Sequence, residues 1–303
     1  MARLGVIDLG SNSVRLVIFE TKEGGASSKP FRTLVDEKKV AGLSSYVESG
    51  MLTQKGIDRA IEVLSDLLGL ALNLKCDRTG IFATAVLRNC ENSKKATRSI
   101  EAAIDHEVHV LSEKEEAHLG FVGASIGRKL ETGTLIDIGG GSAELTALRP
   151  DGDHDGISFP AGCVALYADY VRLVMPTPEE CRAMQQAFEE LLDKAGSLDE
   201  YRAQHAFGIG GTLRAVSKLL AQVHELSSNP ESFTAQDLAA LFRLMESEPG
   251  FFAHSLVKAA PDRVHSLVPG MVITRTLMER LDIHDITLCK YGIREGYLLK
   301  KML

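Results

Sequence analysis

Two short stretches of the sequence each combine an aspartate with glycine and serine, as in turns that hold phosphate. Asp8 precedes Gly-Ser-Asn-Ser at 10–13, and Asp137 precedes Gly-Gly-Gly-Ser at 139–142. Glycine permits positive φ and close approach, so backbone N–H groups can surround an anion. A carboxylate at the end of the preceding strand can hold a metal ion that is bound to the same anion. The chemistry predicted at both stretches is therefore phosphate binding assisted by a divalent cation.

The two stretches are copies of one pattern. At one constant offset five positions coincide: Ile7 with Ile136, Asp8 with Asp137, Gly10 with Gly139, Ser13 with Ser142, and Leu16 with Leu145. A single repeat this far apart predicts two similar domains rather than a solenoid. Each domain would contribute one aspartate and one phosphate-type turn to a shared cleft. A third turn of this kind, Gly210-Gly211-Thr212, follows a predicted strand at 206–209.

The elements that must position these turns alternate between strand and helix. Apolar runs predict strands at 3–9, 14–20, 31–40, 79–85, 108–111, 134–137, 144–149, 157–159, 206–209 and 285–289. Helices are predicted to begin at Thr53, near Lys94, after Ser112 and at Pro178, and then over 235–246, 251–255, 261–281 and 293–302. The first of these helices carries apolar residues at helical spacing, namely Ile57, Ile61, Leu64, Leu68 and Leu72. Loops are predicted at 21–30 and, as a hairpin turn, at 151–153.

Composition excludes several classes of protein. The chain has 303 residues and a net charge of −7, whereas a protein that holds duplex nucleic acid usually carries a basic balance. The five cysteines form no C-x-x-C pair, a pattern typical of reduced thiols in the cytoplasm. We expect neither a secretory leader nor a membrane span, because Asp8 interrupts the first apolar run and no later run is long enough.

The chain resembles the exopolyphosphatase and guanosine pentaphosphate phosphohydrolase (Ppx/GppA) family, which belongs to the superfamily of actin-like sugar kinases and heat-shock ATPases. The resemblance covers nearly the whole chain. It is carried by these motifs: Asp8-Leu-Gly-Ser-Asn-Ser13, Thr84-Ala-Val-Leu-Arg88, Ser112-Glu-Lys-Glu-Glu-Ala117, Asp137-Ile-Gly-Gly-Gly-Ser-Ala-Glu144, Gly208-Ile-Gly-Gly-Thr212, Val268-Pro-Gly270 and Gly292-Ile-Arg-Glu-Gly296. The resemblance implies an α/β fold of two actin-like (ribonuclease H-like) domains, with mixed sheets flanked by helices and a cleft between the domains.

The resemblance also implies a role for each matching residue. Glu116 would be the general base for the attacking water, and Asp137 and Glu144 would be catalytic carboxylates that hold Mg²⁺ or Mn²⁺ and position that water. Asp8 would face them from the other domain as a further metal ligand. Phosphate oxygens would be bound by the following set: Asn12, Ser13, Arg88, Gly139, Gly140, Gly141, Ser142, Gly210, Gly211 and Thr212. Phosphoryl transfer of this kind depends on positioning and charge neutralisation more than on covalent catalysis.

Several of these residues would also fit a purely structural role. Glu116 is predicted in the first turn of a helix, where a carboxylate also favours the helix dipole. Arg88 would equally fit a surface arginine, and Glu144 an outward-facing strand residue. Asp8 and Asp137 fit such a role less well, because each ends a predicted buried strand.

We place the domains at 1–126 and 127–303, with the last helix, 293–303, packing back on the first domain. The expected activity is release of the terminal phosphate of inorganic polyphosphate, and the alternative substrate is guanosine pentaphosphate, which would connect the protein to the stringent response. Two other classes remain: an ATP-dependent kinase of the same superfamily, and a non-catalytic sensor of guanosine tetraphosphate or polyphosphate. From its composition we expect a cytoplasmic protein that binds neither nucleic acid nor membrane, and the resemblance alone suggests a homodimer.

The sequence departs from its longer relatives in two respects. We expect it to lack the additional C-terminal helical region, including an HD-like domain, that longer relatives carry, which puts tight, processive handling of long polyphosphate in doubt. It also has Cys163-Val164-Ala165-Leu166 where many relatives carry an arginine before the leucine, so one phosphate or structural contact is expected to be missing.

Overall fold

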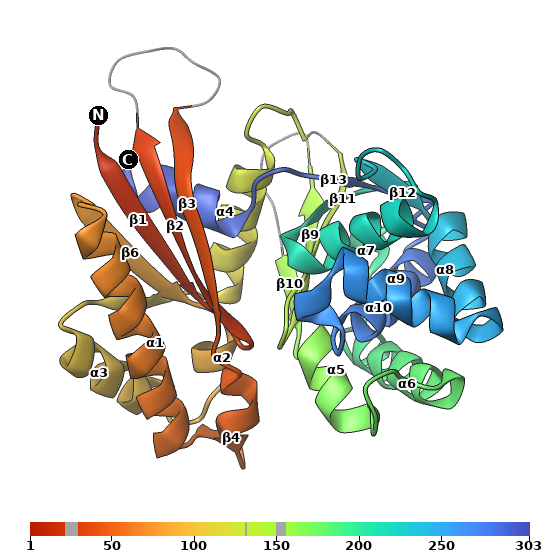
Figure 1. Ribbon diagram of the computed structural model, residues 1–303, viewed down its shortest axis with the longest axis horizontal. Helices are drawn as coiled ribbons and strands as arrows, with labels where there is room; N and C mark the ends of the chain where they lie inside the picture. Colours follow the sequence, from red (N-terminus) through yellow and green to blue (C-terminus); the bar gives the residue numbers. More distant parts are fainter. Residues whose placement is uncertain (22–29, 131, 150–155) are drawn as a thin grey trace. The chain divides into compact units, whose positions relative to one another are not determined.

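The computed structural model describes residues 1–303 except 22–29, 131 and 150–155, and the turn predicted at 151–153 lies outside the described residues. The chain divides into two compact units, which are drawn in Figure 1. Unit 1 comprises residues 1–129 together with 291–303, and unit 2 comprises residues 130–290. The change from unit 1 to unit 2 thus falls three residues later than the boundary expected from sequence. The last thirteen residues group with unit 1.

Unit 1 is built on a five-stranded mixed sheet with the order β3-β2-β1-β6-β7. Its strands are β1 (Arg3–Leu9), β2 (Ser13–Thr21), β3 (Phe31–Val40), β6 (Arg78–Ala83) and β7 (Val108–Val110). β1 pairs antiparallel with β2 and parallel with β6, and β6 pairs parallel with β7. The carboxyl ends of β1, β6 and β7 therefore meet at one edge of the sheet.

Helices cover both faces of this sheet. Alternation along β1 sends Ile7 and Leu9 into a core with α1 (Gln54–Asn73) and α3 (Ser93–Ile104). The same alternation sends Leu4 and Val6 into a second core with α4 (Glu113–Ala124), α11 (Ile293–Tyr297) and the π-helical turn η4 (Leu298–Met302). The smaller elements of unit 1 are η1 (Leu43–Tyr46), β4 (Val47–Glu48), β5 (Met51–Leu52) and α2 (Ala85–Arg88).

The buried stripe of α1 differs from the one predicted. Ile57 and Leu64 are buried as expected, but Leu72 is 76% exposed and the stripe instead includes Val63 and Leu67. Most of the predicted positions are four residues apart, which is 400° of rotation in a helix of 3.6 residues per turn. Each such step therefore moves the side chain about 40° away from the direction of the previous one. The observed stripe mixes steps of three and four residues more evenly and therefore stays on one face.

Unit 2 is built on a six-stranded mixed sheet with the order β10-β9-β8-β11-β13-β12. Its strands are β8 (Gly133–Ile138), β9 (Ala143–Leu148), β10 (Gly156–Phe159), β11 (His205–Ile209), β12 (Ser232–Thr234) and β13 (Asp285–Leu288). Its helices are α5 (Cys163–Tyr170), α6 (Pro178–Lys194), α7 (Gly210–Val223), α8 (Ala235–Ser247), α9 (Pro249–Ala259) and α10 (Leu267–Arg280), with short turns η2 (Asp199–Tyr201) and η3 (Pro261–Arg263). β8 pairs antiparallel with β9 and parallel with β11, as β1 does with β2 and β6.

Unit 2 corrects the sequence-based prediction at three places. α5 was not predicted, because its eight residues begin directly after a glycine with no capping side chain. β12 was also missed, since three residues are too few for a periodic signal. The helix predicted over 261–281 is divided into η3 and α10.

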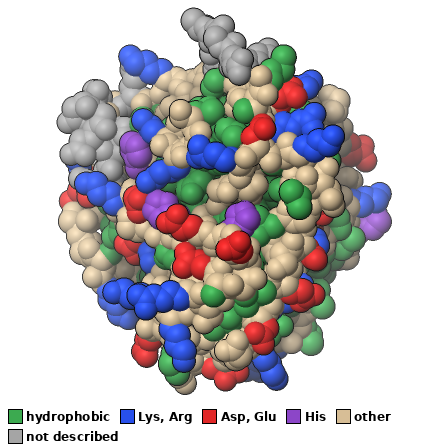
Figure 2. Space-filling view, turned by 90° about the vertical axis from the view of Figure 1, so that its left-hand side faces the viewer, with side chains coloured by type: hydrophobic (Ala, Val, Ile, Leu, Met, Phe, Trp, Pro, Cys, Tyr) green, Lys and Arg blue, Asp and Glu red, His purple; other side chains and the backbone are tan. Residues whose placement is uncertain are grey.

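In the described part of the chain, no helix is both long and apolar enough to cross a membrane. On the face shown in Figure 2, acidic and basic side chains are interspersed with hydrophobic ones.

Candidate functional site

The two duplicated turns have the same backbone structure. In unit 1 the N–H of Gly10 donates to the carbonyl of Ser13 at 3.2 Å, and in unit 2 the N–H of Gly139 donates to the carbonyl of Ser142 at 2.9 Å. Each turn joins an antiparallel strand pair, β1 to β2 in one unit and β8 to β9 in the other. The sequence repeat therefore corresponds to a structural repeat.

A neighbouring segment braces each turn through its carbonyl groups. In unit 1 the carbonyl of Asn12 accepts the N–H groups of Ala41 (2.9 Å) and Gly42 (2.8 Å). In unit 2 the first turn of α5 performs this task, as its N–H groups donate to carbonyls of the 139–142 turn over 2.9–3.0 Å. The three donors and their acceptors are Cys163 to Gly139, and Val164 and Ala165 to Gly140.

The two aspartates face side chains of different charge across their strand pairs, a cation in one unit and a carboxylate in the other. Asp8 lies directly opposite Arg15 in the β1–β2 register. Asp137 lies directly opposite Glu144 in the β8–β9 register. Side chains at directly opposed positions are near neighbours, with about 5 Å between their Cβ atoms. One copy thus pairs a carboxylate with a guanidinium, and the other brings two carboxylates together.

Asp8 in unit 1 has a second cationic neighbour, Arg294 of α11, with 3.8 Å between Nη1 and Asp8 Oδ2. Arg15 itself forms a bidentate ion pair with Asp36 of β3. Burial raises the pKa of the Asp8 carboxyl, and the charges of Arg294 and Arg15 oppose that rise. The role of Asp8 as a metal ligand stays a prediction, and its charged neighbours are Arg15 across β1–β2 and Arg294 and Glu295 of α11.

Glu116 and Arg88 form an ion pair in unit 1. Nη1 of Arg88 donates to Oε2 of Glu116, and both side chains are only 13% exposed. Arg88 closes α2, which follows β6, whereas Glu116 lies in the first turn of α4, which follows β7. Both residues therefore lie beyond the sheet edge at which β1 and Asp8 end. The alternative of Arg88 as an exposed surface residue is wrong.

The N-terminus of α4 forms as the sequence predicts. Ser112 is its N-cap, and Glu115 completes a capping box with it. Lys301 of η4 and His109 of β7 each approach Oε1 of Glu115 at 3.3 Å. Although burial opposes this, the hydrogen bonds from Ser112 and Lys301, with a smaller contribution from His109, lower the pKa of the Glu115 carboxyl. The glutamate next to Glu116 is thus used for structure.

In unit 2 the third turn lies against Asp137. Gly210 begins α7 with φ +86°, and a Cβ there would lie 2.2 Å from Oδ1 of Asp137. The hydroxyl of Thr212 donates to the carbonyl of Ile138 at 2.7 Å, which links the start of α7 to the end of β8. No side chain caps α7, so its first N–H groups and its dipole are suited to binding an anion.

Arg263 of η3 is a cation of this site that the sequence analysis did not single out. Its Nη1 donates to Oγ1 of Thr212 at 3.4 Å, and a Cβ on Gly211 would lie 2.1 Å from its Nη2. The guanidinium therefore lies directly against the start of α7. The motif Val268-Pro-Gly270, which follows Arg263 closely, was the only sequence signal in this region, and it carries no charge.

The donor set of unit 2 fits a divalent cation. Glu144 is only 7% exposed and accepts a hydrogen bond from Ser158 at 3.1 Å, so the alternative of Glu144 as an outward-facing residue is wrong. Two carboxylates directly opposite one another repel unless a proton or a cation lies near them. Among the described residues no three His, Cys, Asp or Glu gather as a metal cluster. One or two carboxylates, completed by water and substrate phosphates, are nonetheless the usual protein share of a Mg²⁺ site.

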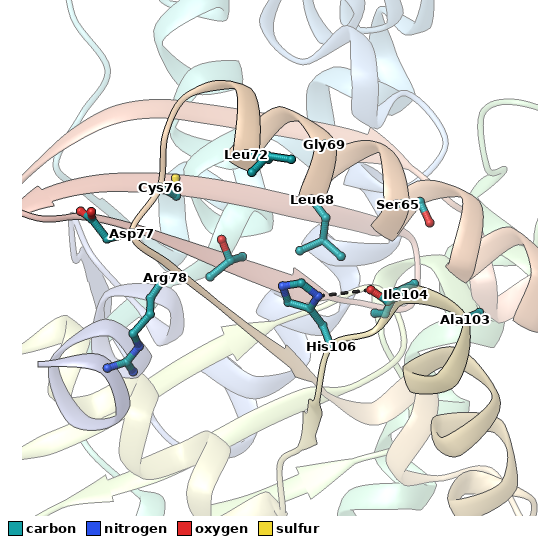
Figure 3. Close-up of a pocket in the computed structure, with 11 residues that line it drawn as sticks. Ser65, Leu68, Gly69, Leu72, Cys76, Asp77, Arg78, Ala103, Ile104 and His106 are labelled. Carbon is teal, nitrogen blue, oxygen red and sulfur yellow. Dashed lines mark hydrogen bonds between the residues drawn. The ribbon is translucent and has the colours of Figure 1, made fainter.

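A cavity of about 550 Å³ lies elsewhere in unit 1 (Figure 3). It is lined by residues of α1, by the end of α3 and the His106 that follows it, and by the start of β6, among them Leu68 and Arg78. It lies at the amino end of β6, opposite the edge that carries Asp8, and no candidate site residue lines it.

The structure thus gathers the predicted residues into one set per unit. Unit 1 holds Asp8, Asn12, Ser13, Arg88 and Glu116 at the edge where β1, β6 and β7 end. Unit 2 holds Asp137, the 139–142 turn, Glu144 and the Gly210–Thr212 turn, where β8 and β11 end. Arg15, Arg294 and Arg263 join these sets as residues that the sequence analysis did not assign.

Comparison with known proteins agrees with this arrangement. The model of the Ppx/GppA phosphatase family matches residues 6–303. Exopolyphosphatase 1 of Mycobacterium tuberculosis is 25% identical to the chain, over 99% of it and 88% of the relative. A guanosine-5'-triphosphate,3'-diphosphate pyrophosphatase of Pseudoalteromonas translucida is also 25% identical, over 97% of the chain but 58% of the relative.

Solved structures show the same fold. An exopolyphosphatase of Cytophaga hutchinsonii superposes with a TM-score of 0.81, at 22% identity and with 98% of this chain and 96% of that chain covered. A Ppx/GppA protein of Aquifex aeolicus superposes with a TM-score of 0.75, at 23% identity and with coverage of 99% and 97%.

Two mixed sheets that each carry the same glycine- and serine-rich turn after an aspartate define an α/β protein with the actin-like ATPase fold. Within that class, the chain belongs to the Ppx/GppA phosphatase family.

Proposed function

We propose that the protein is an exopolyphosphatase, which releases the terminal phosphate of inorganic polyphosphate by direct attack of water. The observation that carries the proposal is the pair Asp137 and Glu144, directly opposed on β8 and β9 beside the uncapped start of α7. This arrangement places carboxylates for a cation next to N–H groups for an anion. The relatives named exopolyphosphatase support the choice of polyphosphate.

Glu116 is the proposed general base. Its carboxylate accepts a hydrogen bond from Arg88, which favours the ionised form, and that form can take a proton from water. The side chain is only 13% exposed, which restricts bulk solvent around the carboxylate. Arg88 would also contribute positive charge toward the phosphate that the water attacks.

Within each unit, backbone N–H groups and hydroxyls of the turns would bind phosphate oxygens. Asn12 and Ser13 supply these groups in unit 1, and Gly139–Ser142 and Gly210–Thr212 supply them in unit 2. Arg263 adds a guanidinium beside Thr212. Asp137 and Glu144 would hold Mg²⁺ or Mn²⁺, which when bound would neutralise charge on the phosphate oxygens.

The test is phosphate release from polyphosphate with purified protein, Mg²⁺ and the variant Glu116→Gln. We expect release that stops when the metal is chelated, and a kcat about 10²–10⁴-fold lower in E116Q. Glu113→Gln is the matched control, because Glu113 lies exposed in the same first turn of α4. Full activity in E116Q would refute the assignment of Glu116 as the base. Phosphate release that continues after the metal is chelated would refute the requirement for a metal ion.

Guanosine pentaphosphate is the second candidate substrate, since a relative named for the cleavage of this nucleotide matches 97% of the chain. The same assay with the nucleotide in parallel decides between the two. A kcat/KM higher for the nucleotide than for polyphosphate would keep the proposed machinery and change the substrate. Tight binding of guanosine tetraphosphate without release from either substrate would favour a sensor, and ADP formation that needs an acceptor would favour a kinase.

A further inference from the structure

We propose that Arg294 of α11 is a positioning residue that holds the carboxylate of Asp8 in its working orientation. The inference rests on the proposed phosphohydrolase function and adds to it a residue from the far end of the chain. Among the described residues, Asp8 is the carboxylate that forms an ion pair with Arg294.

The two oxygens of Asp8 have different surroundings. Oδ2 lies 3.8 Å from Nη1 of Arg294. Oδ1 lies on the side of the 10–13 turn, 3.9 Å from the position that a Cβ on Gly10 would take. One oxygen is thus directed to the arginine and the other to the proposed phosphate-binding turn. Removal of the arginine would leave the carboxylate free to rotate away from the turn.

Arg15 cannot replace Arg294 in this task. The guanidinium of Arg15 is engaged by Asp36, which accepts from both Nε and Nη2. The Nε of Arg294, in contrast, is buried and has no hydrogen-bond partner in the described part of the chain. A buried donor without a partner costs stability. The placement of Arg294 is therefore better explained by its charge beside Asp8 than by a contribution to folding.

The backbone around Arg294 is held firmly to the helix that carries Glu116. A Cβ on Gly296 would lie 1.9 Å from the carbonyl oxygen of Leu119 in α4, and a Cβ on Gly123 of α4 would lie 1.8 Å from the carbonyl oxygen of Gly292. Glu295 accepts the N–H of Gly292 at 2.9 Å and so fixes the start of α11. Since α4 and α11 pack backbone to backbone, this pair of helices carries both the proposed base and the proposed positioning arginine.

The experiment is a double-mutant cycle with Arg294→Gln and Asp8→Asn, assayed by phosphate release and by urea unfolding. We expect R294Q to lower kcat about 10–100-fold, as for a misplaced catalytic group, with little change in KM. Arg294→Lys should recover most of the lost kcat, because it keeps the charge. In the D8N background, R294Q should cause no further loss. Lys300→Gln is the control, since Lys300 is an exposed cation of the same C-terminal segment.

Several outcomes would overturn the proposal. Losses that multiply in the double variant would show that Arg294 acts independently of Asp8. A raised KM with unchanged kcat would show that Arg294 contacts the substrate, and an equal loss in K300Q would show a general effect of charge.

The unfolding measurements separate this inference from the proposed function. If Arg294 holds Asp8, R294Q should change the unfolding equilibrium constant about fivefold less in the D8N background than in the wild type. A wild-type protein that releases no phosphate would refute the proposed function, and the unfolding cycle would still decide whether the two side chains are coupled. Equal effects of R294Q in both backgrounds would refute the coupling, whatever the activity.

Discussion

Gly162 offers the sharpest test of how unit 2 supports its phosphate-type turn. Its φ of −107° and ψ of 177° are open to any residue, so alanine would cause no backbone strain. An alanine Cβ would nevertheless lie 2.4 Å from the carbonyl carbon of Gly140 and 2.6 Å from the carbonyl oxygen of Gly139. The predicted cost of Gly162→Ala therefore comes from contact alone.

The size of this cost follows from the contacts. The Cβ and the carbonyl carbon of Gly140 are 2.4 Å apart and must separate by about 1 Å before they are in ordinary contact. Neither atom can move away by a side-chain rotation, so the backbone itself must shift. Overpacking of this kind costs about 1–3 kcal/mol. The shift also disturbs three hydrogen bonds from the start of α5, each worth about 1 kcal/mol. If all three hydrogen bonds are lost, we expect G162A to lose about 4–6 kcal/mol of unfolding free energy and most of its phosphate release.

The assay is urea unfolding together with phosphate release, and Gly250→Ala serves as the control. A Cβ on Gly250, also in unit 2, would meet nothing within 4 Å, so that substitution should leave both measurements nearly unchanged. If G162A matched the wild type in stability and activity, the bracing of the 139–142 turn by α5 would be refuted. A G162A variant that is as stable as the wild type but inactive would show that the substitution changes the geometry of the 139–142 turn without lowering the stability of the fold.

Three further predictions concern single contacts. Thr212→Val keeps the shape of the side chain but removes its hydrogen bond to the carbonyl of Ile138 and the oxygen that accepts from Arg263. We therefore expect the unfolding free energy to fall by about 1–3 kcal/mol. We also expect steady-state kinetics to show a raised KM for polyphosphate. Gly296→Ala drives a Cβ into the carbonyl of Leu119, and thermal unfolding should show a destabilisation of about 3 kcal/mol or more, whereas an unchanged midpoint would contradict the close packing of α4 and α11. In urea unfolding, Leu67→Ala should lower the unfolding free energy by about 2–5 kcal/mol because Leu67 is fully buried. Leu72→Ala should lower it by under about 0.5 kcal/mol because Leu72 is 76% exposed. The opposite order would favour the buried face first predicted from sequence.

Much of the fold follows from local signals in the sequence. The strands before and after the duplicated turns are strongly apolar, and the structure places them within one or two residues of their predicted bounds. The capping box of Ser112 and Glu115 predicted the start of α4 for the same reason, since its two partners are close together in the chain. Such elements depend on neighbours in the chain, which a sequence displays directly.

The remaining features depend on residues that are distant in sequence. Arg263 lies in no motif, and Arg294 lies in the Gly292–Gly296 motif without an assigned role, so their relevance appears only when η3 lies against α7 and α11 lies against α4. The different partners of Asp8 and Asp137 were likewise hidden. Leu16 and Leu145 preserve the repeat, whereas Arg15 and Glu144 occupy equivalent positions with opposite charge, and only the strand register shows that each faces its aspartate.

The grouping of residues 291–303 with residues 1–129 has a consequence for the order in which the protein folds during synthesis. Unit 2 is one continuous segment, and all of it leaves the ribosome before α11 does. Until then, the face of the first sheet that Tyr297 and Leu298 cover stays open, with Val6, Phe82 and Leu119 exposed. The first unit therefore cannot complete its fold, and this apolar surface stays uncovered, while about 160 further residues are synthesised. We expect chaperones to meet this protein at that stage, and a stalled chain that ends at residue 290 to be far more prone to aggregation than the full chain.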